Sequence, residues 1–179
     1  MARGLIKPQP LTAAKLRDLA LTYAARFATT EAKLASYLRR KLRERGWADD
    51  TSPEPGMLAA EFTSLGYVND QLFAEGKAAA LGRKGMGKLR VKSTLRAAGI
   101  AEAIAQPLCE PNPSEDFARA LKFAERKRIG PYCLSPPDDR ARNRWVGAFL
   151  RAGHPPQIAY RIINFAHVRD AQEALSEFD

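Results

Sequence analysis

The sequence predicts an all-α protein made of three tandem three-helix repeats. Alanine, leucine, arginine, lysine and glutamate, which favour helices, dominate the chain, and strand-like runs of alternating β-branched and aromatic residues are absent. The motifs LRERG, LRAAG and FLRAG end at Gly46, Gly99 and Gly153, which stand 53 and 54 residues apart. A period near 50 residues is typical of helical arrays, in which each repeat packs partly on its neighbour. We therefore expect an elongated body.

Three helices are expected in the first repeat. Leucine, alanine and aromatic side chains at a spacing of three to four residues predict an amphipathic helix over residues 12–27. Thr29 or Thr30 can cap a second helix, whose leucine stripe runs to Gly46. We expect this glycine to stop the helix in the left-handed conformation. A third helical stretch covers residues 57–65.

The second and third repeats have the same order of elements. Large apolar residues stand four and eight residues before the glycine in every repeat, so each middle helix carries the same apolar stripe. Third helices are expected over residues 101–109 and 157–165. The glycines at 82, 85 and 87 predict a flexible joint between the first two helices of the second repeat. The resulting boundaries are 1–66 for an N-terminal tail and the first repeat, 67–111 for the second, 112–168 for the third and 169–179 for a C-terminal tail.

The composition is that of a folded protein with an anionic partner. The 179 residues include 29 Lys and Arg against 20 Asp and Glu, which gives a formal net charge of +9 and favours a polyanion without choosing its class. No run approaches the roughly 20 apolar residues of a membrane span, and the first residues do not resemble a signal peptide. Cys109 and Cys133 lack CxxC spacing, which fits a reducing compartment. We expect a cytoplasmic protein with no membrane association.

The basic residues gather in three clusters. One lies in the second helix of the first repeat, one between Glu75 and Glu102, where no acidic residue occurs, and one at 126–128. A run of charge can be merely the solvated face of a helix, but two clusters at equivalent places in a repeat favour a binding face. The predicted contacts with a partner or DNA are Arg39, Arg40, Arg43, Lys84, Lys88, Arg90, Lys92, Arg96, Arg126, Lys127 and Arg128.

The chain lacks the residue patterns of the common catalytic sites. Neither His154 nor His167 has a histidine partner at helical spacing, and both are expected to be structural or exposed. Cys109 and Cys133 have no histidine base, and no GK[ST] follows the glycine-rich joint. Adjacent acids such as Asp49–Asp50 usually cap helices rather than hold Mg²⁺. We predict a protein that is not an enzyme, with no catalytic residue, cofactor or metal site.

The segment LGYVNDQLFAE, Leu65–Glu75, resembles a signature of the RecX family of recombination regulators. In that signature a Leu-Gly-Tyr ends one repeat and leads through an Asp/Asn pair into the next helix. Here Tyr67 is expected to pack over the junction, Asn69 or Asp70 to cap the following helix and Phe73 to begin its buried stripe. The basic segment GMGKLRVKSTLRAAGI that follows is similar to the most basic segment of the family.

The resemblance covers about residues 12–166 and implies both a fold and a function. Members of the family are built of three tandem three-helix units, helix-turn-helix-like in character, that form a curved body. They bind the RecA recombinase, in particular its filament on single-stranded DNA, and limit filament extension, ATP hydrolysis and strand exchange without a cofactor. We expect a monomer whose partners are the RecA filament and single-stranded DNA, with double-stranded DNA as a further candidate.

Two other functions are compatible with the residues. A capped two-helix unit with basic residues is also what a helix-turn-helix transcriptional regulator offers. Between Lys88 and Arg96, however, only Ser93 and Thr94 accompany the basic residues as polar side chains, which favours phosphate contact over the reading of base edges. The other alternative is a structural helical adaptor, which would depend on neither nucleic acid nor a recombinase.

Overall fold

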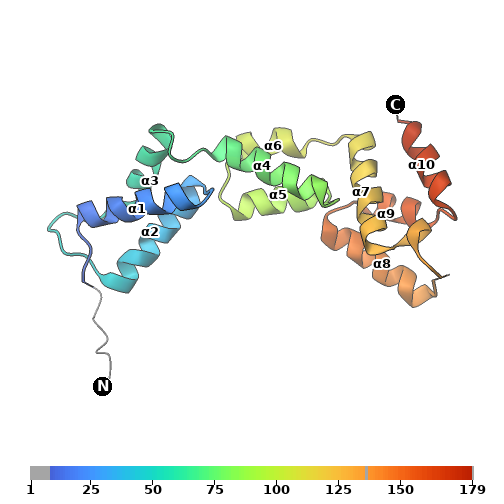
Figure 1. Cartoon of the computed structure of the whole chain (residues 1–179), viewed down its shortest axis with the longest axis horizontal. Helices are drawn as coiled ribbons and strands as arrows, with labels where there is room; N and C mark the ends of the chain where they lie inside the picture. The colour runs from blue at the N-terminus through green and yellow to red at the C-terminus, as the bar shows by residue number, and fades with distance from the viewer. Residues whose placement is uncertain (1–8, 136, 179) are drawn as a thin grey trace, which may run out of the picture. The chain divides into compact units, whose positions relative to one another are not determined.

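The structure, a computed structural model, describes residues 9–135 and 137–178. Within these ranges it forms ten α-helices and one short 3-10 turn and contains no β-strand, so the all-α prediction is confirmed (Figure 1). The elements are α1 (Ala13–Arg26), α2 (Glu31–Arg45), α3 (Pro55–Ser64), α4 (Asp70–Arg83), α5 (Lys88–Ala97), α6 (Glu102–Cys109), α7 (Pro113–Lys127), η1 (Gly130–Tyr132), α8 (Asp139–Ala152), α9 (Pro156–Ile163) and α10 (Val168–Ser176). Among the described residues, no helix has both the length and the apolar character that a membrane crossing requires.

The chain divides into two compact units. The first contains residues 9–73 together with Ala98–Ile100, and the second contains residues 74–97 and 101–178. Along the chain, α2, α5 and α8 each end shortly before one of the three repeated glycines, in agreement with the expected order of elements. How the three repeats pack on one another stays a prediction.

Threonine side chains fix the starts of the first two helices. Thr12 Oγ1 accepts a hydrogen bond from the Lys15 N–H at 3.3 Å, and Thr30 Oγ1 accepts one from the Lys33 N–H at 3.2 Å. Each bond satisfies an amide in the first turn that has no partner within its own helix. Thr30, and not its neighbour Thr29, is therefore the N-cap of α2.

Gly46 ends α2 in a conformation that differs from the expected one. Its φ of +81° is positive, but its ψ of 179° is extended and not left-handed helical, so that part of the prediction is wrong. The extended exit places Trp47 in an isolated parallel bridge with Leu11. The Leu11 N–H donates to Gly46 O at 3.0 Å, and the Ala48 N–H donates to Leu11 O at 2.9 Å. Gly153, by contrast, ends α8 in the left-handed region, with φ of +87° and ψ of 22°.

The turn between α3 and α4 is held by polar side chains of the LGYVND segment. Asn69 Oδ1 accepts a hydrogen bond from the Leu72 N–H at 2.9 Å and so caps α4. Asp70 Oδ1 accepts one from the Glu31 N–H, also at 2.9 Å, and therefore caps the start of α2. Between α3 and these caps, Val68 is buried in the core of the first unit. The motif therefore follows α3, caps α4 through Asn69 and caps α2 through Asp70.

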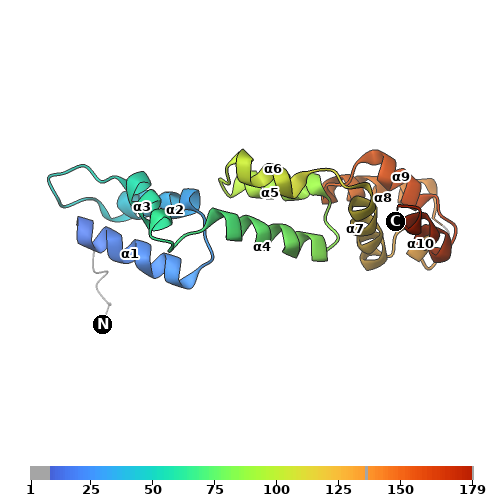
Figure 2. The same ribbon diagram turned by 90° about the horizontal axis from the view of Figure 1, so that it is seen from above.

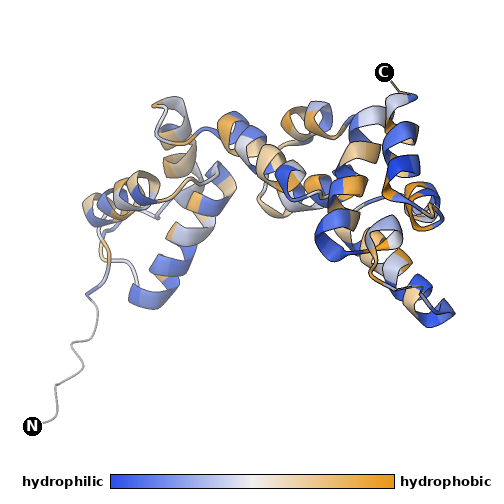
Figure 3. Ribbon diagram, turned by 45° about the vertical axis from the view of Figure 1, so that its right-hand side comes forward, coloured by the Kyte–Doolittle hydropathy of each residue, from blue (hydrophilic) through white to orange (hydrophobic). Residues whose placement is uncertain are grey.

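The main core of the second unit lies among α7, α8, α9 and α10 (Figure 2). Phe117 and Phe123 of α7, Phe149 of α8 and Ile162 of α9 are all buried in it. The rings of Phe123 and Phe149 meet edge to face, with their centroids 5.1 Å apart. In Figure 3 the ribbons of α8 and α10 contain both hydrophilic and hydrophobic residues, as expected of amphipathic helices.

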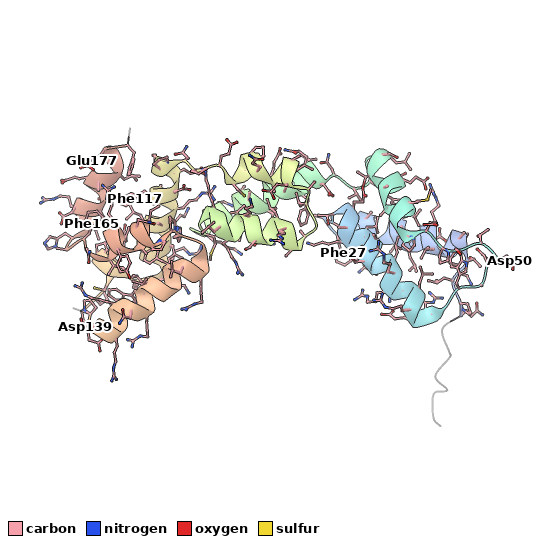
Figure 4. All side chains as sticks on the ribbon, turned by 180° about the vertical axis from the view of Figure 1, so that it is seen from behind. Phe27, Asp50, Phe117, Asp139, Phe165 and Glu177 are labelled. Carbon is pink, nitrogen blue, oxygen red and sulfur yellow. The ribbon has the colours of Figure 1, made fainter. Side chains whose placement is uncertain are left out.

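The segment 169–179, expected to be a C-terminal tail, contains most of α10. Ala171 and Ala174 are buried in the core of the second unit, and the ring centroid of Phe178 lies 5.6 Å from that of Phe117. Phe117 is labelled in Figure 4. Alanines at a spacing of three allow the helix to pack closely on α7. Leu175 of α10 packs against the same core.

Candidate partner-binding surface

The middle helices of the first two repeats carry basic residues at the same positions relative to their glycines. Seven and three residues before Gly46 stand Arg39 and Arg43, and seven and three residues before Gly99 stand Lys92 and Arg96. All four side chains are exposed. Because residues four apart share one face of a helix, each pair forms a two-cation face. We call Arg39 and Arg43 the α2 basic face and Lys92 and Arg96 the α5 basic face.

The α2 basic face is not neutralised by neighbouring carboxylates. Glu44 binds the cations on the other side of the helix, with Oε2 2.6 Å from Lys41 Nζ and Oε1 3.7 Å from Arg40 Nε. The hydrogen bond from Lys41 holds the pKa of Glu44 below its usual value. Among the described residues, no carboxylate lies within 4.0 Å of the guanidinium of Arg39 or Arg43. These two arginines are therefore available to an external anion.

Lys88, in contrast, is committed to contacts within the second unit. Its side chain is only 13% exposed, and its Nζ lies 3.1 Å from Glu115 Oε2 and 3.8 Å from Asp116 Oδ1 at the start of α7. It also donates a hydrogen bond to the carbonyl of Glu110. Burial acts to raise the pKa of Glu115, but hydrogen bonds from Arg119 and Lys88 outweigh it and hold that pKa below its usual value. Lys88 thus joins α5 to α7.

The rest of α5 presents charge more than hydrogen-bonding capacity. Arg90 and Arg96 are exposed, and Lys92 Nζ makes an exposed ion pair with Glu102 at 2.6 Å. The hydroxyls of Ser93 and Thr94 both donate to the carbonyl of Arg90, at 3.0 and 2.7 Å. The two uncharged polar side chains are therefore occupied within the helix itself.

The cluster at 126–128 closes α7 as expected. Arg126, Lys127 and Arg128 are all exposed, and Arg128 is the C-cap, with φ of +53° in the left-handed region. Its N–H donates to Glu125 O at 3.1 Å. Cations in this position interact favourably with the carbonyl end of a helix, so part of the cluster has a structural role.

A second group of cations forms where α4 meets α7. Arg83, Arg119 and Lys122 line a groove of about 380 Å³ between these helices, together with Glu115, whose carboxylate pairs with Arg119 at 2.5 Å. Lys84, which is exposed, follows Arg83 directly, and Arg126 is one turn beyond Lys122 on α7. In the sequence Lys84 and Arg126 belong to separate clusters. In the structure Arg83, next to Lys84, and Lys122, one turn before Arg126, line the same groove.

Sequence reasoning missed the arginines of the third middle helix. Arg140, Arg142 and Arg144 are exposed on the first half of α8. The positions that match the α2 and α5 basic faces hold Val146 and Leu150 instead. Counting the charged as well as the apolar positions back from Gly153 would have found both the arginines and this difference.

One histidine is buried and the other is exposed. His154 is 1% exposed, its Nε2 lies 2.9 Å from Gly85 O, and its ring packs against Phe123 and Phe149. Burial lowers the pKa of His154, which favours the neutral ring. His167 is exposed and precedes α10. Within the described part of the chain, no three His, Cys, Asp or Glu side chains are grouped so that they could hold a metal ion.

Comparison with known proteins gives several relatives by sequence. No family model matches the chain. A protein of Myxococcus xanthus named regulatory protein RecX is 29% identical over 179 residues, which covers 90% of this chain and 91% of that protein. Proteins of the same name are 25% identical in Agrobacterium fabrum, over 83% of this chain and 80% of the relative, and 32% identical in Deinococcus radiodurans, over 66% and 56%.

The fold has a counterpart among solved structures. The crystal structure of RecX from Lactobacillus salivarius matches with a TM-score of 0.64, covering 86% of this chain and 95% of that one. The two sequences are 19% identical, so the match shows a similar fold.

Proposed function

We propose, since this chain belongs to the RecX family of regulatory proteins, that it binds the filament of a RecA recombinase on single-stranded DNA and limits filament extension, ATP hydrolysis and strand exchange. The observation that carries the proposal is the recurrence of an exposed two-cation face on α2 and on α5. These faces suit phosphates of the filament DNA or acidic surface of the recombinase. Double-stranded DNA would meet the same charges.

Repetition favours a filament over a single molecule as the partner. Linked binding elements act at a high effective concentration once the first of them is bound, so modest contacts made by successive repeats add to a tight complex. We expect the chain to act as a cytoplasmic monomer, and to bind a filament more tightly than either free recombinase or free DNA.

The test is a recombinase ATPase and strand-exchange assay with this protein titrated in. The variant Arg39→Glu/Arg43→Glu reverses the α2 basic face, and Lys92→Glu/Arg96→Glu reverses the α5 basic face. Lys88 is left intact, because its reversal would also break largely buried contacts with α7, whereas the Lys92–Glu102 pair that the second variant removes lies at the surface. We expect each double variant to need about tenfold more protein for half inhibition, while its circular dichroism stays unchanged.

A matched control distinguishes the effect of reversing charge on a basic face from the effect of the change in net charge. Lys15→Glu/Lys77→Glu makes the same change in net charge at exposed lysines of α1 and α4, outside the basic faces. It should inhibit almost as well as the unaltered protein. If phosphates are the contacts, each reversed face should lower the slope of log affinity against log salt by about 1.4, or 0.7 for each lost phosphate. Equal inhibition by the face variants and the control would contradict the proposal.

The two alternatives give different outcomes in the same set of measurements. A transcriptional regulator would protect one specific duplex sequence, although the hydroxyls of Ser93 and Thr94, which bond to Arg90 O, are poorly placed to read bases. A structural adaptor would respond to neither recombinase nor nucleic acid.

A further inference from the structure

A groove on the first unit shares no residue with the α2 basic face. It is formed by the end of α1, the connection to α2, the turn after α3 and the start of α4, and its volume is about 410 Å³. The residues that line it with large side chains are Arg26, Phe27, Tyr67, Leu72 and Phe73, and Thr29 lies among them. We call it the α1–α4 groove. Phe27, at its edge, is labelled in Figure 4.

Three large, mainly apolar side chains of the groove are more than half exposed to solvent. Phe27 is 53% exposed, Tyr67 55% and Leu72 64%, although each is large and mainly apolar. Three such side chains around one depression form a patch, and exposed apolar patches rimmed by polar groups mark interaction sites. The volume is sufficient for a few side chains of a partner.

Thr29 gives a second, independent sign of a missing partner. The residue is 5% exposed, and its Oγ1 is buried without a hydrogen bond. The adjacent Thr30 is a contrast, because its Oγ1 donates to Ala98 O at 2.6 Å and accepts from the Lys33 N–H at 3.2 Å. A buried hydroxyl without a partner is unfavourable. Thr29 lines the groove, so a small movement of the groove wall on binding would let a backbone N–H or C=O of the ligand reach this hydroxyl.

Two cations lie beside aromatic rings that line the groove. The guanidinium carbon of Arg26 lies 5.9 Å from the ring centroid of Phe27, and Lys33 Nζ lies 4.4 Å from that of Phe73. The nearby carboxylate of Asp70 already accepts the hydrogen bond from the start of α2. An occupant with acidic residues beside an apolar anchor would therefore complement these cations.

We propose that the α1–α4 groove docks a polypeptide segment that carries a leucine or phenylalanine flanked by aspartate or glutamate. The inference deepens the proposed function, on which it rests for the identity of the partner, by assigning a protein contact to this groove and phosphate contacts to the basic faces. Nucleobases are less suited to it, because Phe27 and Tyr67 each already contact another aromatic ring, with centroids 5.2 and 5.3 Å apart, and Leu72 offers no stacking face.

The test uses the full chain and a fluorescent peptide, Asp-Glu-Leu-Phe-Asp-Glu, with Asp-Glu-Ser-Gly-Asp-Glu as the peptide control. Leu72→Glu removes the most exposed apolar side chain of the groove and repels the acidic flanks. It also places a carboxylate in the first turn of α4, three residues after the Asn69 cap, which favours the helix. The matched control is Met57→Glu, at a 70% exposed apolar residue outside this groove.

We expect saturable binding of the Leu-Phe peptide, a loss of about 30-fold in affinity for Leu72→Glu and almost none for Met57→Glu. Thr29→Val, which keeps the side-chain shape, should also weaken binding while the protein stays folded. The proposal is overturned if the Leu-Phe peptide fails to bind at about 1 mM, or if Leu72→Glu and Met57→Glu bind it equally.

Competition separates this proposal from the function it deepens. A short oligothymidylate that displaces the peptide, and whose own binding Leu72→Glu weakens, would assign the groove to nucleobases and overturn the proposal. Displacement of the peptide by recombinase would support both proposals. Peptide binding that depends on Leu72 but resists excess recombinase would support the groove and contradict the recombinase as its partner.

Discussion

Gly87→Ala tests a close approach of two backbone segments in the second unit. The Gly87 N–H donates to Ala152 O at 2.9 Å, and a Cβ added at Gly87 would lie 2.2 Å from Gly153 O. Real Cβ atoms essentially never come within 3.0 Å of such an atom, so α5 and the end of α8 would have to separate by about 0.8 Å, the difference of these two distances. Overpacking of this kind costs about 3 kcal/mol when backbone must move. The gain from a stiffer unfolded chain leaves a net loss of about 2 kcal/mol.

The same substitution at Gly76 is the control. Gly76 lies inside α4, and a Cβ there would meet nothing within 4 Å. Alanine in a helix interior is more favourable than glycine by about 1 kcal/mol, so Gly76→Ala should stabilise the protein. Two identical changes eleven residues apart are therefore expected to have opposite signs.

Tryptophan fluorescence reports this experiment, because Trp47 lies in the first unit and Trp145 in the second. Urea unfolding in a Trp47→Phe background follows Trp145 alone and gives the free energy of unfolding of the second unit. A Gly87→Ala protein as stable as its parent would show that the contact between Gly87 and Gly153 is not made. A loss of stability in Gly76→Ala as well would show that the added methyl group acts elsewhere.

Three further predictions concern single side chains. Lys88→Met should lower the free energy of unfolding of the second unit by about 2 kcal/mol, because it removes charged hydrogen bonds to α7, and a matched Lys84→Met, at an exposed lysine, should not. Because burial lowers the pKa of His154, the folded state binds this proton less readily than the unfolded state, so stability should fall as pH drops below about 6.5. Urea titrations between pH 7.5 and 5 test this, and a His154→Phe protein that shows the same fall would refute the assignment. Thr29→Val should raise the free energy of unfolding of the unbound protein by about 1 kcal/mol, since it removes a buried hydroxyl without a partner, and a lower melting temperature would contradict that reasoning.

The order of helices was predictable because its signals are local. The glycines that follow α2 and α8 stop their helices within one residue, and the apolar side chains four and eight residues before them can be counted along the chain. For the N-cap of α2, the sequence narrowed the candidates to two adjacent threonines but did not distinguish them. Thr29 and Thr30 are equally good caps by residue type, and only the packing of Ala98 beside Thr30 distinguishes them.

The positions of the basic residues could be predicted from the sequence, but which of their side chains are exposed to a partner could not. Lys88 and Lys92 are lysines of the same helix, yet Lys88 is largely buried against carboxylates more than 25 residues away, whereas Lys92 pairs with Glu102 at the surface. The α1–α4 groove was beyond sequence reasoning, because Phe27 and Leu72 are 45 positions apart and become neighbours only in the fold.

The return of the chain to the first unit at Ala98–Ile100 decides how this protein can be cut into fragments. A fragment that ended at residue 66, where the first repeat was expected to end, would lose Val68 from its core and the Asp70 cap of α2. One that ended at residue 73 would still deprive Thr30 Oγ1 of its acceptor, Ala98 O. Gene fragments drawn along the sequence repeats should therefore yield a less stable first unit than a fragment that continues through residue 100.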